Sequence, residues 1–239
     1  DGSSGSHSIT AVGDVRWFAP KVGAGAMAFD GTTDYLTFDD NTIGYIPGTG
    51  SDSNGGAITY ECWVKFRNLP TGDDSTAHTI FAQTNDNTSA NYARLTYDSG
   101  VKWRWRAYNS SDSAVIDLSV ADTGVAINTW HHVAFVLDGT DVEIFRDGVS
   151  KGTGSLSGTP RTADNNFQVA MYTRDSGNDA ALDGYMDQFR ISRVVRYTTT
   201  FTPSTTAFTD DINTVLLLNA DINQGTWAED TSTGLAIST

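Results

Sequence analysis

Two aspartates offer the clearest candidate carboxylate pair in the sequence. Asp183 and Asp187 are four residues apart and would share one face of a regular strand. Retaining glycoside hydrolysis needs two carboxyl groups about 5–5.5 Å apart across the scissile bond. The glutamates Glu61, Glu143 and Glu229 each stand alone. Because no closely spaced set of carboxylates repeats along one strand, we expect a protein that is not an enzyme.

The four histidines do not follow a spacing typical of a metal or catalytic site. His131 and His132 are neighbours in a strand-like segment, and successive strand residues point to opposite faces. That geometry is poor for two ligands of one zinc ion. We expect one of the two to be buried and hydrogen-bonded, and the other to face solvent or a neighbouring strand.

A basic strand is the most unusual local feature of the chain. In the segment Lys102–Tyr108, alternation places Trp103 and Trp105 on one face and Arg104, Arg106 and Tyr108 on the other. The tryptophan face is expected to join the core. The basic face is either a ligand platform, where arginine and tyrosine contact sugar hydroxyls or carboxylates, or a partner of acidic groups on neighbouring strands or another subunit.

Loops at the edges of a sheet are the other candidate sites for sugar. The segments Thr71–Thr79, Thr84–Asn91 and Thr173–Asn178 are rich in Asp, Asn and Thr, which suit carbohydrate hydroxyls and also any exposed loop. Near the last of these, Tyr172 and Arg174 are the strongest single candidates for ligand contacts.

Composition excludes several classes of function. The formal net charge is −14 and the sequence pI is about 4.4, so the surface repels phosphate backbones and nucleic-acid binding is disfavoured. No apolar run approaches the ~20 residues of a membrane helix, and no signal peptide is visible. Cys62 is the only cysteine, so the chain has no internal disulfide.

The elements that position these residues are predicted to be strands. Short runs rich in Val, Ile, Phe, Tyr, Trp and Thr alternate with Gly, Asp, Asn and Ser clusters, which is typical of a sandwich or barrel. The predicted strands are Ala26–Phe29, Tyr35–Phe38, Ile58–Phe66, His78–Gln83, Ala93–Tyr97, Val101–Tyr108, Trp130–Leu137, Val142–Arg146, Asn166–Tyr172, Leu182–Ile191 and Thr214–Asn219. Short Gly-containing turns at 98–100 and 138–141 predict antiparallel hairpins.

Five segments in order resemble one family. They are Phe29-Asp-Gly-Thr-Thr-Asp-Tyr35, Glu61-Cys-Trp-Val64, Trp130-His-His-Val-Ala134, Phe145-Arg-Asp-Gly148 and Gly184-Tyr-Met-Asp-Gln-Phe-Arg-Ile191. This order is similar to that of laminin-G-like domains of the concanavalin A-like lectin/glucanase superfamily, over residues 26–192. The resemblance implies an all-β, two-sheet antiparallel β-sandwich of the concanavalin-like jelly-roll type.

The resemblance also implies a structural calcium ion where the closing strand passes an early Asp-Gly turn. Its ligands would be Asp187, Asp30 and Gly31, with Asp34 a weaker candidate. Calcium accepts carboxylate and carbonyl oxygens together, so these residue types suit it. The alternative is that Asp30 and Asp34 only cap a turn, and that Asp187 bonds to Arg190.

The chain is expected to be one domain over residues 1–239, with residues 193–239 as a C-terminal extension. Residues 196–218 resemble the linker that follows such domains in phage virion and marine adhesin-like proteins. The Leu-rich strand at 215–218 either returns to the same sandwich or begins a neighbouring module. The similar segments at 1–5 and 230–234 also suggest tandem copies.

The predicted function is a non-catalytic carbohydrate-binding or adhesion module on a phage virion or another extracellular surface. Its partners would be a glycan or other surface subunits, including tandem or homo-oligomeric neighbours, with neither nucleic acid nor membrane insertion. The alternative is a structural virion protein, a capsid decoration or tail component, that acts through protein–protein contacts. A divergent β-glucanase is the least favoured reading, because the alternating E-x-D-x-x-E carboxylate pattern is absent from the sequence.

Overall fold

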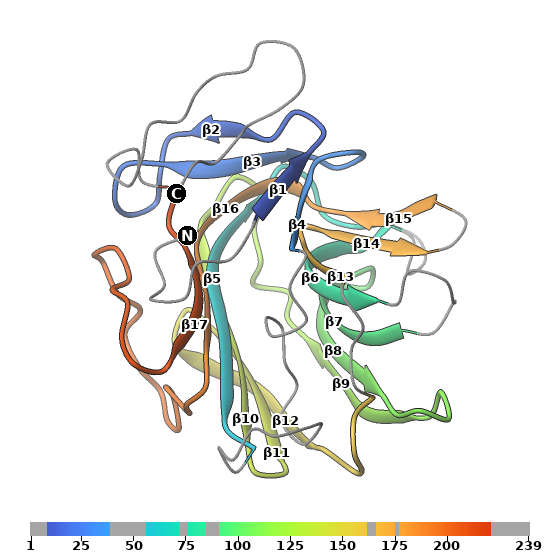
Figure 1. The fold of residues 1–239 in the computed structure, drawn as a ribbon. Coiled ribbons are helices and arrows are strands. Elements are labelled where there is room, and N and C mark those ends of the chain that lie inside the picture. Colours follow the sequence, from blue (N-terminus) through green and yellow to red (C-terminus); the bar gives the residue numbers. More distant parts are fainter. Residues whose placement is uncertain are drawn as a thin grey trace.

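The structure, a computed structural model, describes residues 9–38, 56–71, 76–84, 91–161, 166–174 and 177–220. Two antiparallel sheets face each other, and a short hairpin lies beside one of them (Figure 1). None of the described residues forms an α-helix, and accordingly the described segments hold no helix that could cross a membrane. The predicted all-β sandwich is confirmed.

Seven strands form the first sheet, sheet A. In spatial order they are β1 (Ile9–Val12), β4 (Tyr35–Phe38), β13 (Asn166–Val169), β6 (His78–Thr84), β7 (Asn91–Asp98), β8 (Lys102–Tyr108) and β9 (Ala114–Ala121). The last four pair in chain order as a meander. The short turn at 98–100 that the sequence predicts joins β7 to β8.

The second sheet, sheet B, has eight strands. In order they are β12 (Val149–Ser155), β11 (Asp141–Arg146), β10 (His131–Asp138), β5 (Ile58–Phe66), β16 (Asp183–Ser192), β3 (Ala26–Asp30) and β2 (Arg16–Phe18), with β17 (Thr214–Leu218) paired to the second half of β16. The separate hairpin consists of β14 (Met171–Arg174) and β15 (Gly177–Ala181).

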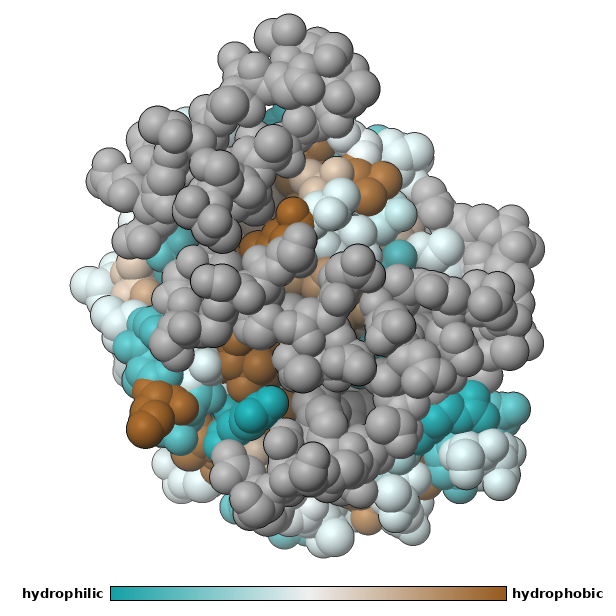
Figure 2. Space-filling view, in the orientation of Figure 1, coloured by the Kyte–Doolittle hydropathy of each residue, from teal (hydrophilic) through white to brown (hydrophobic). Residues whose placement is uncertain are grey.

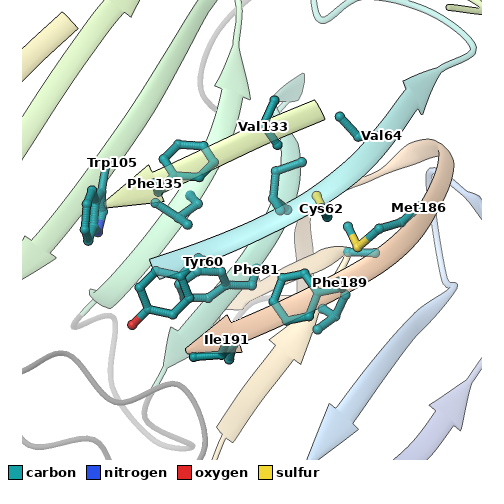
Figure 3. Packing of buried hydrophobic residues seen from close by; sticks show 14 of the residues in the cluster. Tyr60, Cys62, Val64, Phe81, Trp105, Val133, Phe135, Met186, Phe189 and Ile191 are labelled. Carbon is teal, nitrogen blue, oxygen red and sulfur yellow. The ribbon is translucent and has the colours of Figure 1, made fainter. Parts of the chain in front are cut away.

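The core lies between the two sheets and is rich in aromatic rings (Figure 3). Tyr60 on β5 lies 4.4 Å from Phe81 on β6 and 6.0 Å from Trp105 on β8, measured between ring centroids. The strands inside each sheet contribute alternate residues to this core, which is why their other residues form an outer face on each sheet. The outer faces of sheets A and B therefore point in opposite directions.

A β-bulge in β16 changes which residues reach the outer face of sheet B. The register with β5 shifts between Asp187 and Arg190, and Gln188 has a φ of 53°. The extra residue reverses the alternation, so Met186 and Phe189 both point into the core. Asp187 and Arg190 consequently both lie on the outer side.

Residues 193–213, the covering segment, pack across the outer face of sheet B. Val195, Tyr197 and Phe201 contact a small apolar cluster that includes Val136 and Phe145. After this segment the chain returns as β17, and Leu216 pairs with Ile191 of β16. The Leu-rich strand is thus part of the same sheet, which is one of the two alternatives left open by the sequence.

Candidate functional site

The outer face of sheet A carries the predicted basic strand. On β8, Trp103 and Trp105 are fully buried, whereas Arg104, Arg106 and Tyr108 are half-buried on the opposite face, as the alternation predicts. Tyr108 lies at the end of β8, where its carbonyl accepts a hydrogen bond from the backbone N–H of Arg161 at 2.8 Å. It is therefore at the margin of this face.

Neighbouring strands extend the basic face. Arg94 on β7 pairs in register with Arg106, and Arg106 pairs with Asp117 on β9. We call Arg94, Arg104 and Arg106 the arginine face. The register places the charged side chains of Arg94, Arg106 and Asp117 side by side on three neighbouring strands, at the ~4.8 Å spacing between strands.

Asp117 holds two of these arginines. Its Oδ1 accepts hydrogen bonds from Arg104 Nη2 at 3.1 Å and from Arg106 Nε at 3.4 Å. Arg104 Nη1 also lies 3.7 Å from Asp98 Oδ2. Pairing with acids on neighbouring strands, one of the two interpretations of this strand, is thus present, and it fixes the direction of the guanidinium groups.

Tyr172 has a different position from the one predicted. The chain turns at Ala170, with a φ of 70°, so the predicted strand Asn166–Tyr172 is divided into β13 and β14, and Tyr172 is only 2 % exposed where an accessible ligand contact is predicted. The β14–β15 hairpin packs on β6, and Arg94 Cζ lies 4.9 Å from the Tyr172 ring centroid. Tyr172 therefore covers Arg94, which is only 3 % exposed, so Arg104 and Arg106 are the accessible arginines of the arginine face. Arg174 ends β14, and its side chain lies outside the described residues.

Arg94 also lies on this outer face, although it is not among the candidates that the sequence predicts. It lies in the predicted strand Ala93–Tyr97, opposite Ala93 and Leu95, which enter the core. The same alternation that identified Arg104 would have placed Arg94 on the outer face. Arg94 is not conspicuous in the sequence, because it is the only basic residue in its strand, whereas the strand at 102–108 has three.

The turn after β3 carries three of the four predicted calcium ligands, Asp30, Gly31 and Asp34. The Asp30 carboxylate accepts backbone hydrogen bonds from Thr32 at 2.7 Å, Thr33 at 2.8 Å and Asp34 at 3.1 Å. Burial opposes ionisation of Asp30, yet these hydrogen bonds hold its pKa well below the ordinary value. Gly31 has a φ of 79°, which the turn requires.

Asp34 is buried, and its carboxylate already binds a backbone N–H group. Its Oδ1 accepts the backbone N–H of Asp14 at 2.6 Å, and burial raises the pKa of its carboxyl. Burial makes the charged form of this carboxyl less favourable than it is in water, which weakens Asp34 as a ligand for calcium.

The fourth predicted ligand, Asp187, is distant from this turn. Asp30 pairs with Asp183, so Asp187 lies four residues further along β16, roughly 13 Å at about 3.3 Å per residue. Its fully buried Oδ2 accepts the backbone N–H groups of Lys21 at 2.9 Å and Val22 at 3.0 Å.

The four residues do not fit one calcium coordination set. Across the described ranges, no group of three or more His, Cys, Asp or Glu is placed to hold a metal ion. Asp187 does not bond to Arg190 either, because Arg190 binds Glu61. Calcium binding stays a prediction of the sequence resemblance.

The candidate carboxylate pair is also separated. Asp183 binds Arg67 Nε at 2.6 Å and accepts a hydrogen bond from Asn68, whereas Asp187 is buried on backbone donors. The spacing along the strand exceeds the ~5–5.5 Å of a retaining pair and the ~6.5–9.5 Å of an inverting pair. These two carboxylates do not have the geometry for glycoside hydrolysis.

Glu61 is buried in an ionic cluster beneath the covering segment. Arg190 Nη2 donates to its Oε1 at 2.6 Å, Tyr197 donates to its Oε2 at 2.6 Å, and His132 Nε2 lies 3.1 Å from Oε2. Burial alone would raise the pKa of Glu61, but the hydrogen bond from His132 and the charge of Arg190 hold it below the ordinary value. This arrangement joins the covering segment to sheet B.

Both histidines are buried, and His132 faces a neighbouring strand, one of the two predicted alternatives, because its Nε2 lies 3.1 Å from Glu61 Oε2 on β5. His131 lies 5 % exposed with its Nδ1 2.8 Å from Asp147 Oδ2, and its Nε2 accepts the backbone N–H of Ala126 at 3.2 Å. His132 points the other way, as a strand requires, but the covering segment closes that side. A segment more than sixty residues further along the chain removes His132 from solvent.

Residues 148–152 contain a serine between two glycines. Gly148-Val149-Ser150-Lys151-Gly152 has the spacing of a nucleophile elbow. That elbow needs a sharp turn from a strand into a helix, whereas Ser150 lies within edge strand β12 and pairs with Phe145. The motif therefore lacks the context that gives it chemical meaning.

The toxin domains with the same fold are distant in sequence. The receptor-binding domain of the botulinum neurotoxin C/D mosaic serotype aligns with a TM-score of 0.60 and 13% identity, covering 80% of this chain and 44% of the toxin chain. The binding domain of Paraclostridial Mosquitocidal Protein 1 gives a TM-score of 0.58 at 10% identity, covering 80% and 45%. This chain thus spans less than half of either structure, and at such identity the similarity shows the fold alone.

Sequence comparison identifies the family. No curated protein matches the chain at a significant level. The family profile Laminin_G_3, described as the concanavalin A-like lectin/glucanases superfamily, matches residues 30–199, which is more than half of the chain. This chain belongs to the concanavalin A-like lectin/glucanases superfamily.

Proposed function

We propose that the chain is a non-catalytic carbohydrate-binding module and that it binds glycans on the arginine face of sheet A. The observation that carries this proposal is the cationic character of that face in a chain with a net charge of −14. Among the accessible outer side chains that the structure describes on β7, β8 and β9, three cations (Lys102, Arg104 and Arg106) face one carboxylate (Asp117), whereas Arg94 and Asp98 on the same side are buried. This part of the surface therefore has more positive than negative groups, although the chain as a whole is acidic.

The geometry supports hydrogen bonding to sugars. Each guanidinium has five N–H donors in a planar fork, which matches the hydroxyl and carboxylate oxygens of sugars. The ion pairs hold both groups in place, so little side-chain entropy is lost when a ligand binds. Acidic glycans suit this surface best, because arginine forms bidentate contacts with carboxylates.

Membership of a lectin and glucanase superfamily supports the class of ligand, and the two aspartates of β16 support the absence of hydrolysis. The toxin domains of similar fold are named receptor-binding or binding domains, which agrees with a binding role. We further propose display on a virion or another extracellular surface, on the resemblance of residues 196–218 to linkers of such proteins. Antibody labelling of intact particles tests this location.

A glycan array that contains neutral and acidic glycans tests the function. We expect the wild-type chain to bind acidic glycans, and the double variant Arg104→Gln/Arg106→Gln to lose about tenfold or more in affinity, because two charged donors are removed. Arg161→Gln is the matched control, since Arg161 binds Asp112 at 2.6 Å in a loop beyond β8. Equal binding by the double variant would show that the arginine face is not the site, and release of reducing sugar from any array ligand would contradict the non-catalytic assignment.

A further inference from the structure

The outer face of sheet B carries a lysine enclosed by three aromatic rings. Lys65 Nζ lies 4.5 Å from the ring centroid of Tyr185, 4.8 Å from that of Phe18 and 5.0 Å from that of Trp130. We call Phe18, Lys65, Trp130 and Tyr185 the aromatic cage. Phe18, Lys65 and Tyr185 come from β2, β5 and β16, and Trp130 directly precedes β10, so neighbouring parts of sheet B build the cage.

The sheet register explains why these residues meet. Tyr185 is the direct partner of Lys65, and His131 is the partner of Val64, which places Trp130 beside Lys65 on the other side. Tyr185 pairs with Ala28 of β3 and Phe18 pairs with Ala26 of the same strand, so Phe18 lies diagonally from Tyr185, and the two ring centroids are 4.2 Å apart. The cage is therefore a row across the sheet and not a chance contact between loops.

The cage faces outward and is accessible. Phe18 is 37 % exposed and the adjacent Trp17 is 50 % exposed, while Lys65, Trp130 and Tyr185 are half-buried. Phe18 belongs to the few large apolar side chains that the described part of the chain leaves at the surface. Aromatic rings that remain exposed together on one sheet face are typical of ligand contact surfaces.

The nearby carboxylates are already bound elsewhere. Asp183, next but one to Tyr185, binds Arg67 and Asn68, and Asp187, on its other side, accepts backbone hydrogen bonds. No ion pair joins Lys65 to a carboxylate within the described segments. The surrounding rings remove water from the ammonium group and lower the pKa of Lys65. An anion bound next to Lys65 would stabilise the charged ammonium group and offset the loss of its hydration.

We propose that the aromatic cage is a second binding site, for an acidic saccharide, in which the rings contact the C–H face of a sugar and the Lys65 ammonium pairs with its carboxylate. The rings supply apolar area and the single cation supplies selection for charge. This site shares with the proposed function only the class of ligand, because it lies on the opposite face of the sandwich from the arginine face.

Two probes separate charge from shape. Oligogalacturonate has a carboxylate on every ring, and its methyl ester has the same rings without the charge. We expect oligogalacturonate to shift the NMR resonances of the Trp130 indole and the Tyr185 ring, and the ester to bind about tenfold more weakly or less, because a charge-assisted hydrogen bond is lost.

Three variants locate the interaction. Lys65→Gln removes the charge and keeps the stem, and Phe18→Ala removes the most exposed ring. Lys21→Gln is the matched control, since Lys21 Nζ lies 4.7 Å from the Trp63 ring centroid on the same face but outside the cage. Calorimetric titration should show about tenfold or greater loss of affinity for Lys65→Gln, a smaller loss for Phe18→Ala and none for Lys21→Gln. Each variant should melt within a few degrees of the wild-type chain.

The outcomes distinguish this site from the proposed function. Resonance shifts confined to β7–β9, or wild-type affinity in Lys65→Gln measured with Arg104→Gln/Arg106→Gln as background, overturn the aromatic cage and leave the arginine face intact. Loss in Lys65→Gln that persists in the same background supports the cage even if the arginine face proves inactive. Equal affinity for the acid and its ester also overturns the proposal.

Discussion

At the residue scale, Glu61 is the most constrained charged group of sheet B. Replacing it by glutamine keeps the shape but leaves Arg190 buried without its counter-charge. Breaking one partner of a buried ion pair costs about 3–5 kcal/mol. We therefore expect Glu61→Gln to lower the free energy of unfolding by about this amount in urea denaturation, whereas Glu143→Gln, a half-buried glutamate on β11, should change it little. Equal effects of the two changes would contradict the cluster.

Asp147 is expected to make the free energy of unfolding depend on pH in the acidic range. Burial opposes its ionisation, but the hydrogen bonds from His131 and from the backbone N–H of His132 lower its pKa from 3.8 to about 2. A carboxyl whose pKa is depressed on folding stabilises the protein above its unfolded pKa, and this contribution is lost as the pH falls towards the folded value. Asp147→Asn should therefore be less stable than the wild-type chain at pH 6, and the difference should shrink between about pH 4 and pH 2.

The variant suits this measurement because the turn tolerates it. Asp147 has a φ of 52°, a conformation that asparagine accepts well. The pH series of urea denaturation curves for both proteins gives the result directly. A difference that stays constant from pH 6 to pH 2 would show that the Asp147 contacts do not form as described.

A substitution of Asp187 distinguishes a role in calcium binding from a role in backbone hydrogen bonding. Its carboxylate accepts two backbone N–H groups of the 19–25 loop, so Asp187→Asn should lower stability by about 1–3 kcal/mol, in line with the loss of hydrogen bonds to a buried charge. The loss should be the same in EDTA and in excess calcium. A melting temperature that rises with calcium in the wild-type chain, but not in Asp187→Asn, would instead place the ion at this residue.

At the element scale, strands rich in β-branched and aromatic residues were predictable and polar ones were not. Ile58–Phe66 has the same ends in the sequence prediction and in the structure, because apolar alternation continues to both ends. By contrast, β12 reads Val-Ser-Lys-Gly-Thr-Gly-Ser and was missed, since an edge strand needs no buried face of its own. The bulge in β16 was also unpredictable, because its position is set by packing against β5 and β17.

The covering segment depends on one glycine in the β11–β12 turn. A Cβ on Gly148 would meet the carbonyl oxygen of Phe201 at 1.7 Å, and Phe201 donates its backbone N–H to Gly148 at 2.9 Å. Gly148→Ala should therefore displace the covering segment from sheet B. Gly100→Ala is a close control, since the φ values are 76° and 78° and a Cβ on Gly100 meets nothing within 4 Å.

The two alanine variants should differ in stability and in proteolysis. Both pay the cost of a left-handed alanine, about 1–2 kcal/mol. Gly148→Ala should lose about 1–3 kcal/mol more because of the overlap with Phe201. Limited proteolysis should then cut residues 193–213 faster in Gly148→Ala alone. Similar cleavage in both variants would mean that the turn does not hold the segment.

At the scale of the whole molecule, charge and hydropathy are unevenly distributed. The described surface in Figure 2 mixes hydrophilic and hydrophobic patches, and the chain as a whole has a net charge of −14. The family was predictable because five short segments keep their order around a common core. The two candidate sites were only partly so, because the cage joins Phe18, Lys65, Trp130 and Tyr185 through sheet pairing between strands distant in sequence.

Two binding faces on opposite sides of one sandwich predict that a single molecule bridges polysaccharide chains. At about 0.15 M salt the Debye length is about 8 Å, so repulsion between distant carboxylates and a polyanion is screened while contacts at the arginine face and the aromatic cage persist. Light scattering of the wild-type chain mixed with polygalacturonate should therefore pass through a maximum as the ratio of the two is varied. Lys65→Gln and Arg104→Gln/Arg106→Gln should each still bind the polymer but produce no maximum, because either change leaves one site per molecule. A maximum that survives in both variants would contradict two independent faces, since bridging would then come from association of the protein with itself.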